Sequence, residues 1–313
     1  MSTSIACPSP AGLLRGPQRL AVALLVVTTI TILKGAMTTS TGSGLAFLDW
    51  PLSDGQLMPE RSYRTLPGFF EHFHRLFGAL AGLLSLSLML WLQRVARGSA
   101  AARTALFGLV LIVVQGVVGG VGVLKSLPAV TSVTHGTLAQ LTLATFAWLA
   151  YQLSDRHRGT RPVATVPTGS GRKLVVIALL VLVVQTVVGA LARHTNSPHA
   201  LWTHVGNAMV VFVVAAIATA FAVGRLGEAP GIRGLARALV TLLIVQIGLG
   251  FVALAIRNAA GKTPENVANL GTALVISVHV LIGALLTMLM ATLAAHVFRA
   301  TRSPAADPVR DPA

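Results

Sequence analysis

Long apolar runs are the feature that most constrains how this chain can fold. Eight runs reach the roughly 20 residues that a helix needs to cross a bilayer. They begin near Leu20, Leu76, Thr104, Pro128, Leu174, Ala200, Leu235 and Leu270. Because 54% of the 313 residues are hydrophobic and only 11% are charged, a soluble enzyme is excluded. The sequence predicts an all-α membrane protein with eight transmembrane helices.

The basic residues predict the orientation of these helices. The chain has 24 Lys and Arg against 9 Asp and Glu, a net charge of +15. About two thirds of the basic residues lie in the termini and in alternate connections, which are cytoplasmic under the positive-inside rule. We therefore expect a multi-pass protein of the cytoplasmic (inner) membrane, surrounded by lipid, with both termini cytoplasmic. Since topology accounts for the charge, no nucleic-acid partner is expected.

The two halves of the chain resemble each other. The widest inner connection, residues 154–173, separates four runs from four runs, so we predict two duplicated four-helix bundles, at 1–160 and 161–313. The segment Gly35 to Ser43 follows the first run much as Gly189 to Ser197 follows the fifth, with Gly, Ala, Thr and Ser at equal offsets. A duplicated chain should build the same local structure twice.

A second repeat places Gln four residues before Gly. It occurs at Gln115/Gly119, Gln185/Gly189 and Gln246/Gly250. Amide side chains and small residues are the usual means by which apolar helices associate in lipid, so we interpret this repeat as helix packing.

Four histidines carry the clearest chemical signal. His74, His135, His204 and His279 fall one in each even-numbered run, all near the outer face, and Gly or Ala follows each four residues later, on the same helix face. A lone intramembrane histidine can be a packing residue. Four at matched depth favour two bis-histidine heme sites, one per half, with the small residues leaving room for the porphyrin. Since Cys7 is the only cysteine, no intrachain disulfide or cysteine-based metal site is expected.

The long outer loop, residues 38–70, leads into a second candidate group. Glu71, His74 and Arg75 share one helix face by spacing, whereas His72 falls on the opposite face and is expected at the membrane interface. A carboxyl group beside an apolar span suits general acid or base chemistry. An ion pair between Glu71 and Arg75 explains the spacing equally well.

The loop and the helix entry resemble a known family. The segment Gly42-Ser43-Gly44-Leu45-Ala46-Phe47-Leu48-Asp49-Trp50-Pro51-Leu52, followed by Glu71-His72-Phe73-His74-Arg75, is similar to the first outer loop and second helix of heme A synthases. The resemblance covers essentially the whole chain. It implies oxidation of the C8 methyl group of heme O to the formyl group of heme A, the heme used by terminal oxidases.

The resemblance also implies roles for individual residues. His204 and His279 would be the axial ligands of a resident heme b that transfers electrons. His74 and His135 would bind the substrate heme O, and Glu71 would assist proton removal from the methyl group.

Further implications concern support and partners. Arg75 and Arg193 would support the site or pair with heme propionates. Heme O synthase and an unidentified electron acceptor would be partners, and an oligomer is left open.

The sequence departs from the family pattern at several positions. Phe47 and Ser53 stand where many bacterial members carry cysteines, Thr38-Thr39-Ser40 lacks an arginine, and Val205 replaces the arginine expected after His204. Two other functions therefore stay open. One is a noncatalytic bis-histidine b-type cytochrome, and the other is a transporter or assembly protein in which the histidines pack or conduct protons.

Overall fold

The structure is a computed structural model that describes residues 13–163, 168–260 and 269–301. Within these ranges it is helical, with no strand beyond an isolated bridge between Ser53 and Gln56. The long helices are α2 (Arg15–Ser40), α4 (Leu66–Val95), α5 (Ala100–Leu124), α6 (Ala129–Gln152), α8 (Thr168–Thr195), α9 (Pro198–Leu226), α10 (Ile232–Ala260) and α11 (Leu270–Ala300). Two short helices, α3 (Arg61–Arg64) and α7 (Asp155–Gly159), lie in the connections.

Seven of the long helices are long and apolar enough to cross a membrane, which makes the chain a multi-pass membrane protein. The exception is α6, whose 24 residues include Ser132, His135, Gln140 and several threonines. Helix α6 packs against α2, α5, α8 and α11, so much of its surface meets protein rather than lipid.

The start predicted for the second span, near Leu76, is wrong. Helix α4 begins at Leu66, where the Thr65 hydroxyl accepts a hydrogen bond from the Gly68 N–H at 3.2 Å and Pro67 occupies the first turn. Threonine caps and early prolines stabilise helix starts independently of hydropathy. Consequently Glu71 and His74 lie within the first turns of α4.

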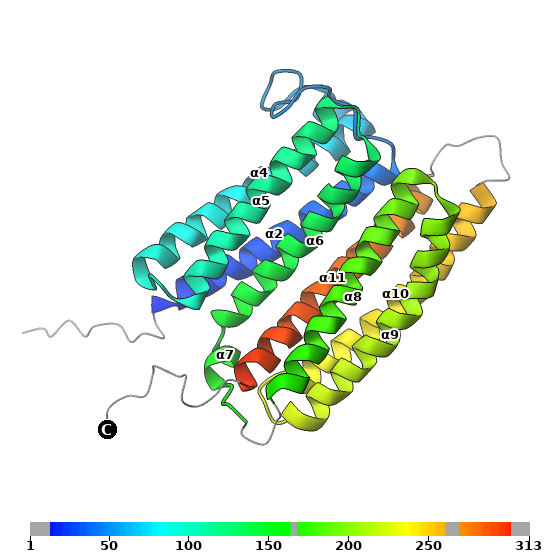
Figure 1. Ribbon diagram of the computed structural model, residues 1–313. Coiled ribbons are helices and arrows are strands. Elements are labelled where there is room, and N and C mark those ends of the chain that lie inside the picture. The colour runs from blue at the N-terminus through cyan, green and yellow to red at the C-terminus, as the bar shows by residue number, and fades with distance from the viewer. Residues whose placement is uncertain (1–12, 164–167, 261–268, 302–313) are drawn as a thin grey trace, which may run out of the picture.

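The helices form two four-helix groups of the same design (Figure 1). In the first group α2, α4, α5 and α6 pack in that cyclic order, so α4 and α6 face each other diagonally. In the second group α8, α9, α10 and α11 take the equivalent places, with α9 opposite α11. The described chain starts and ends at the same end of the molecule, near α7.

Polar bridges join the two groups inside the bundle. Gln140 Oε1 on α6 accepts hydrogen bonds from the hydroxyls of Thr186 on α8, at 3.0 Å, and Thr287 on α11, at 3.2 Å. Nearer the outer end, the hydroxyls of Ser40 and Ser277 lie 3.0 Å apart and share a hydrogen bond. In a low-dielectric interior these bonds hold two particular helix faces together.

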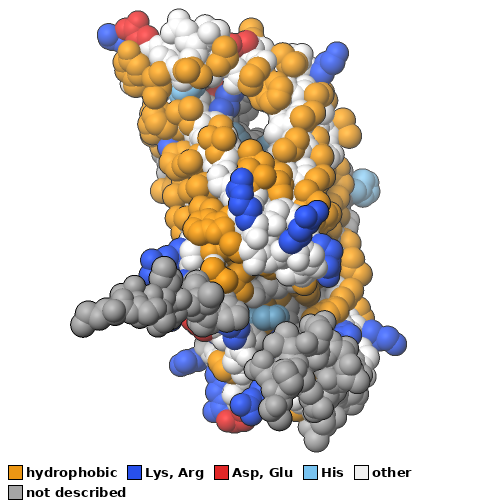
Figure 2. Space-filling view, turned by 90° about the vertical axis from the view of Figure 1, so that its left-hand side faces the viewer, with side chains coloured by type: hydrophobic (Ala, Val, Ile, Leu, Met, Phe, Trp, Pro, Cys, Tyr) orange, Lys and Arg blue, Asp and Glu red, His pale blue; other side chains and the backbone are white. Residues whose placement is uncertain are grey.

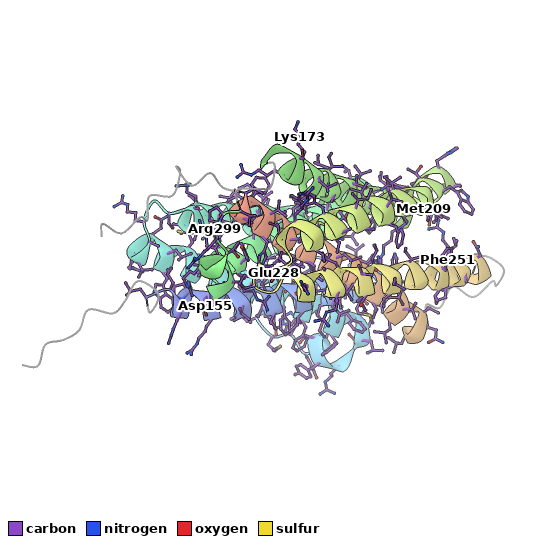
Figure 3. All side chains as sticks on the ribbon, turned by 90° about the horizontal axis from the view of Figure 1, so that it is seen from below. Asp155, Lys173, Met209, Glu228, Phe251 and Arg299 are labelled. Carbon is purple, nitrogen blue, oxygen red and sulfur yellow. The ribbon has the colours of Figure 1, made fainter. Side chains whose placement is uncertain are left out.

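The outer surface of the bundle is apolar. Hydrophobic side chains cover much of the face shown in Figure 2. In Figure 3 the charged residues Asp155, Lys173, Glu228 and Arg299 gather at one end, whereas Met209 and Phe251 lie farther along α9 and α10. Met209 and Phe251 are 61% and 64% exposed, as expected for side chains that face lipid.

Gly108 provides a test of packing in the first group. A Cβ atom at Gly108 would lie 2.6 Å from the buried ring of Phe146, whereas one at Gly116 on the same helix would meet no atom within 4 Å. We expect Gly108→Val to destabilise the protein by about 1–3 kcal/mol and to lower its apparent Tm in detergent. Gly116→Val is the matched control, and an equal Tm shift in both variants would contradict this packing.

Candidate functional site

The first histidine pair lies in the interior of the first group. His74 on α4 and His135 on α6 face each other diagonally, with ring centroids 6.1 Å apart and ring planes at 84°. Both lie in the first turns of their helices, which confirms their predicted matched depth. The fold therefore brings together the two histidines that the sequence assigned to one half.

The second pair has nearly the same geometry. His204 on α9 and His279 on α11 have ring centroids 6.3 Å apart and planes at 78°. Two imidazoles that bind one metal atom from opposite sides, with nitrogen-to-metal bonds of about 2 Å, place their ring centres roughly 6 Å apart. Both pairs match that spacing.

Backbone carbonyls fix the orientation of three of the four rings. The Nδ1–H groups of His74, His135 and His204 donate to the carbonyl oxygens of Thr31, Gln115 and Gln185, at 3.0, 3.1 and 3.1 Å. Because Nδ1 carries the proton in each case, Nε2 keeps its lone pair for a metal.

A glycine one helical turn beyond each of these backbone positions admits the ring. Ideal Cβ atoms at Gly35, Gly119 and Gly189 would lie 2.7, 2.8 and 2.7 Å from Cε1 of His74, His135 and His204. At Gly250 the corresponding distance to His279 is 3.3 Å. The interpretation of the Gln-x-x-x-Gly repeat as packing alone was therefore incomplete, because the same turn anchors and accommodates a histidine. The segment Thr31 to Gly35 does so without glutamine.

The donor set fits heme better than a bare ion. Across the described ranges, no three His, Cys, Asp or Glu side chains come close enough together to hold a metal ion. Each site offers one pair of imidazoles, and a porphyrin supplies the remaining nitrogen ligands itself. All four histidines are partly buried residues.

The small residues that follow the histidines differ in their surroundings. A Cβ at Gly78, after His74, would come no closer than 4.0 Å to Thr31. A Cβ at Gly283, after His279, would lie 3.2 Å from the Gln246 amide nitrogen. The expected room is present beside His74, whereas beside His279 the Gln246 side chain fills it.

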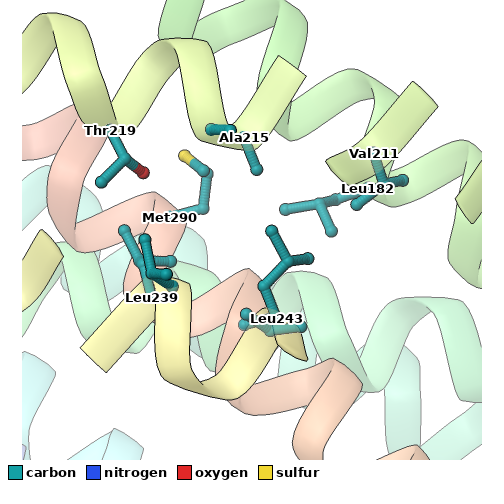
Figure 4. Close-up of a pocket in the computed structure, with 10 residues that line it drawn as sticks. Leu182, Val211, Ala215, Thr219, Leu239, Leu243 and Met290 are labelled. Carbon is teal, nitrogen blue, oxygen red and sulfur yellow. The ribbon is translucent and has the colours of Figure 1, made fainter. Parts of the chain in front are cut away.

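A narrow apolar cavity lies inward of the second pair (Figure 4). Val211 and Leu286 in its wall lie seven residues after His204 and His279, roughly 10 Å along each helix. The wall also includes Leu182, Ala215, Leu239, Leu243 and Met290. The inner side of this site is therefore suited to apolar groups.

The outer loop is held to α4 by Glu71 and Arg75. The Glu71 side chain is 3% exposed, pairs with Arg75, and accepts a hydrogen bond from the Phe47 N–H at 3.0 Å. Arg75 also donates to the carbonyls of Phe47, Asp49 and Leu52. The predicted ion pair is present, and it anchors the loop to α4 next to His74.

His72 is buried beneath the outer loop. His72 is 3% exposed, and its Nδ1 lies 3.0 Å from the Ser53 hydroxyl, because the outer loop folds over this face of α4. Phe47 is fully buried, and its ring packs against His72 with centroids 6.0 Å apart. Phe47 and Ser53 thus attach the loop to α4 by noncovalent contacts.

Asp49 orders the tip of the loop. Its carboxylate accepts hydrogen bonds from the N–H groups of Gly55 and Asp54 at 2.8 and 2.9 Å. These backbone donors, Gly55 foremost, hold the pKa of Asp49 below its usual range. Arg61 forms a two-pronged ion pair with Asp54, which ties α3 to the same turn.

Two arginines lie outward of the second pair. Arg193, on α8, is one turn beyond Gly189 and donates to the Ala36 carbonyl at 3.0 Å and the Ser40 hydroxyl at 2.6 Å, both on α2. Arg257, on α10, donates to the Ala192 carbonyl at 3.0 Å. Arg193 thus belongs to one half and contacts the other.

Sequence reasoning missed several of these residues. Thr31 and Gly35 do not belong to the Gln-x-x-x-Gly repeat, because position 31 is a threonine. Gly35 does match Gly189 in the segment that resembles Gly189 to Ser197. Ser53 was considered only as a replaced cysteine. Arg257 belongs to no motif in the sequence that would indicate a role.

These features define a multi-pass membrane protein with two paired-histidine sites and an ordered outer loop attached to α4, the helix that carries His74. Residues 18–209, more than half of the chain, match the family COX15-CtaA, described as cytochrome oxidase assembly protein. The chain belongs to this family. The matched range includes His74, His135 and His204 and ends before His279.

Individual relatives agree with this assignment. The chain is 29% identical over 174 residues to the heme A synthase of Symbiobacterium thermophilum, covering 54% of this chain and 56% of that protein. It is 26% identical over 168 residues to the heme A synthase of Geobacillus kaustophilus, covering 53% and 52%. The match therefore spans about half the length of each of these relatives.

The loop anchor can be tested by limited proteolysis. Arg75→Leu leaves the buried Glu71 carboxylate without its ion pair, a change that costs about 3 kcal/mol or more. We expect chymotrypsin to cleave the loop, where Leu57 and Tyr63 are exposed, at least tenfold faster than in the parent protein. Glu60→Gln removes only the exposed pair with Arg64 and is the control. Equal cleavage rates in the two variants would rule out the anchoring role of Arg75.

Proposed function

We propose that this protein is a heme A synthase, which oxidises the C8 methyl group of heme O to the formyl group of heme A. The observation that carries the proposal is the pair of histidine sites, each with the ring spacing of bis-imidazole ligation. Family membership and relatives named heme A synthase support it.

Within this proposal the two sites have different occupants. His204 and His279 hold a resident heme b, which supplies electron transfer when bound. His74 and His135 hold the substrate heme O beneath the outer loop. The proximity of the loop anchor to this first pair supports the assignment, because the loop can exclude water from the reacting methyl group.

Glu71 is the proposed catalytic base. The conversion of a methyl to a formyl group releases protons and electrons and adds an oxygen atom, so a proton acceptor is required. Glu71 lies one turn from His74, and its Oε2 would accept the proton while Arg75 keeps the carboxylate oriented.

The contacts of Glu71 also favour a second candidate function. Its carboxylate is engaged by Arg75 and by the Phe47 N–H, which a purely structural anchor would require as well. A noncatalytic b-type cytochrome would keep both histidine pairs and this anchor.

Arg193 is the proposed propionate partner at the second site. Its position one turn outward of Gly189 supports an arrangement in which heme propionates face outward and apolar edges face the inner cavity. Arg75 is a weaker candidate, because its donors already bind Glu71 and the outer loop.

The proposed topology has eight spans in the inner membrane, with α6 as the eighth and both termini cytoplasmic. The length of α6, the common end at which the described chain starts and ends, and the distribution of basic residues support it. The halves 1–160 and 161–313 would be the duplicated units. Heme O synthase, an electron acceptor and, as an open alternative, a second copy of the chain are the proposed partners.

Analysis of extracted hemes tests the proposal. The protein is expressed in a host that makes heme O but no heme A, and its hemes are separated by chromatography and identified by mass. We expect heme b together with heme A or a hydroxylated intermediate. Heme b alone, with heme O supply verified, would establish the cytochrome instead.

Glu71→Gln separates the two roles of this residue. Because glutamine keeps the shape but is a far weaker base, we expect heme content close to that of the parent protein and at least a hundredfold less heme A. The measurement is the ratio of heme A to heme b in the same extraction. Heme A formation at the parent level would eliminate the catalytic-base role.

A further inference from the structure

One histidine in each pair has a side-chain amide at its ligand nitrogen. The Nε2 atom of His135 lies 3.4 Å from the amide nitrogen of Gln115, and the Nε2 atom of His279 lies 3.4 Å from that of Gln246. Within the described part of the chain, Nε2 of His74 and of His204 has no hydrogen bond of this kind. The two amides occupy equivalent places in the duplicated halves.

The tautomer of His135 determines what this contact means. Its Nδ1–H donates to the Gln115 carbonyl, so its Nε2 presents a lone pair to the Gln115 amide N–H. An iron atom requires the same lone pair. The amide hydrogen bond and the iron bond are therefore mutually exclusive, whereas the carbonyl contact to Nδ1 is compatible with either.

The third glutamine of the repeat provides an internal comparison. Gln185 donates to the His204 carbonyl at 3.0 Å, and its Oε1 accepts a hydrogen bond from Asn207 at 2.9 Å. These contacts hold the amide away from the ligand nitrogen of His204. The repeat thus anchors rings through the backbone carbonyls of Gln115 and Gln185, whereas at Gln246 only the side-chain amide lies within hydrogen-bond distance of the ring. Of the three amides, those of Gln115 and Gln246 lie at a ligand nitrogen.

We infer that Gln115 and Gln246 are positioning residues that make His135 and His279 the exchangeable iron ligands, while His74 and His204 are the fixed ones. The inference rests on the proposed heme ligation. It adds which histidine of each pair releases iron first and binds it last. At the substrate site, the Gln115 amide would occupy the Nε2 lone pair of His135 whenever heme is absent, and the ring would stay on the Gln115 carbonyl. A net hydrogen bond of about 1 kcal/mol corresponds to roughly a fivefold effect on affinity.

The test measures heme binding rather than turnover. The full-length chain carrying His204→Leu and His279→Leu, which retains only the first site, is purified without heme and titrated with ferric heme b. We expect Gln115→Leu in this background to bind heme about fivefold more tightly, with a slower dissociation rate. Gln185→Leu, in the same background, should leave the Kd unchanged. An unchanged or weaker Kd for Gln115→Leu overturns the inference.

A second variant guards against misfolding of Gln115→Leu. In the reciprocal background, with His74→Leu and His135→Leu, Gly283→Ala crowds the Gln246 amide, whose nitrogen is 3.2 Å from the added Cβ position. Displacement of the amide should slow heme dissociation from the second site, and an unchanged or faster rate counts against the inference. The same titrations distinguish failure of this inference from failure of the proposed heme ligation. If His135 is not an iron ligand, His135→Leu alone leaves heme binding to the first site unchanged.

Discussion

The structure depends on holding two imidazole rings about 6 Å apart, with their planes nearly perpendicular, in an apolar interior. Three of the four rings have a hydrogen-bond partner for Nδ1, which is stabilising because an unpaired polar group in the bilayer costs several kcal/mol (about 4–8 in the least polar reference solvent). The backbone carbonyls of Thr31, Gln115 and Gln185 provide these partners from a neighbouring helix, and glycines one turn later let the rings approach. The hydrogen bond that anchors each of these rings therefore also sets the direction of its ligand nitrogen, Nε2.

The two four-helix groups share this arrangement. The histidines lie on diagonal helices, α4 with α6 and α9 with α11, and the remaining helices supply the anchoring turns. Hydrogen bonds at Gln140, Ser40 and Arg193 join the halves, so the two sites share one rigid interface. The outer loop is attached to α4, which carries His74, and in the proposed function this contact distinguishes the first site as the substrate site.

Sequence reasoning identified the four histidines, their pairing by halves and the Glu71–Arg75 pair, because these depend on spacing along single helices. It misplaced the start of α4, since a Thr65 cap and Pro67 outweigh hydropathy there. The burial of His72 could not be foreseen, because it depends on how a 25-residue loop folds back. The function of Gly119 and Gly189 required knowing which helices are neighbours.

The most direct test of the account is the number and ligation of hemes in single-histidine variants, measured by low-temperature electron paramagnetic resonance of the ferric protein. The account predicts two low-spin signals, one lost in both His74→Leu and His135→Leu and the other lost in both His204→Leu and His279→Leu. Loss of one signal by variants from different halves, or survival of both signals in any of the four variants, would contradict paired ligation within each half.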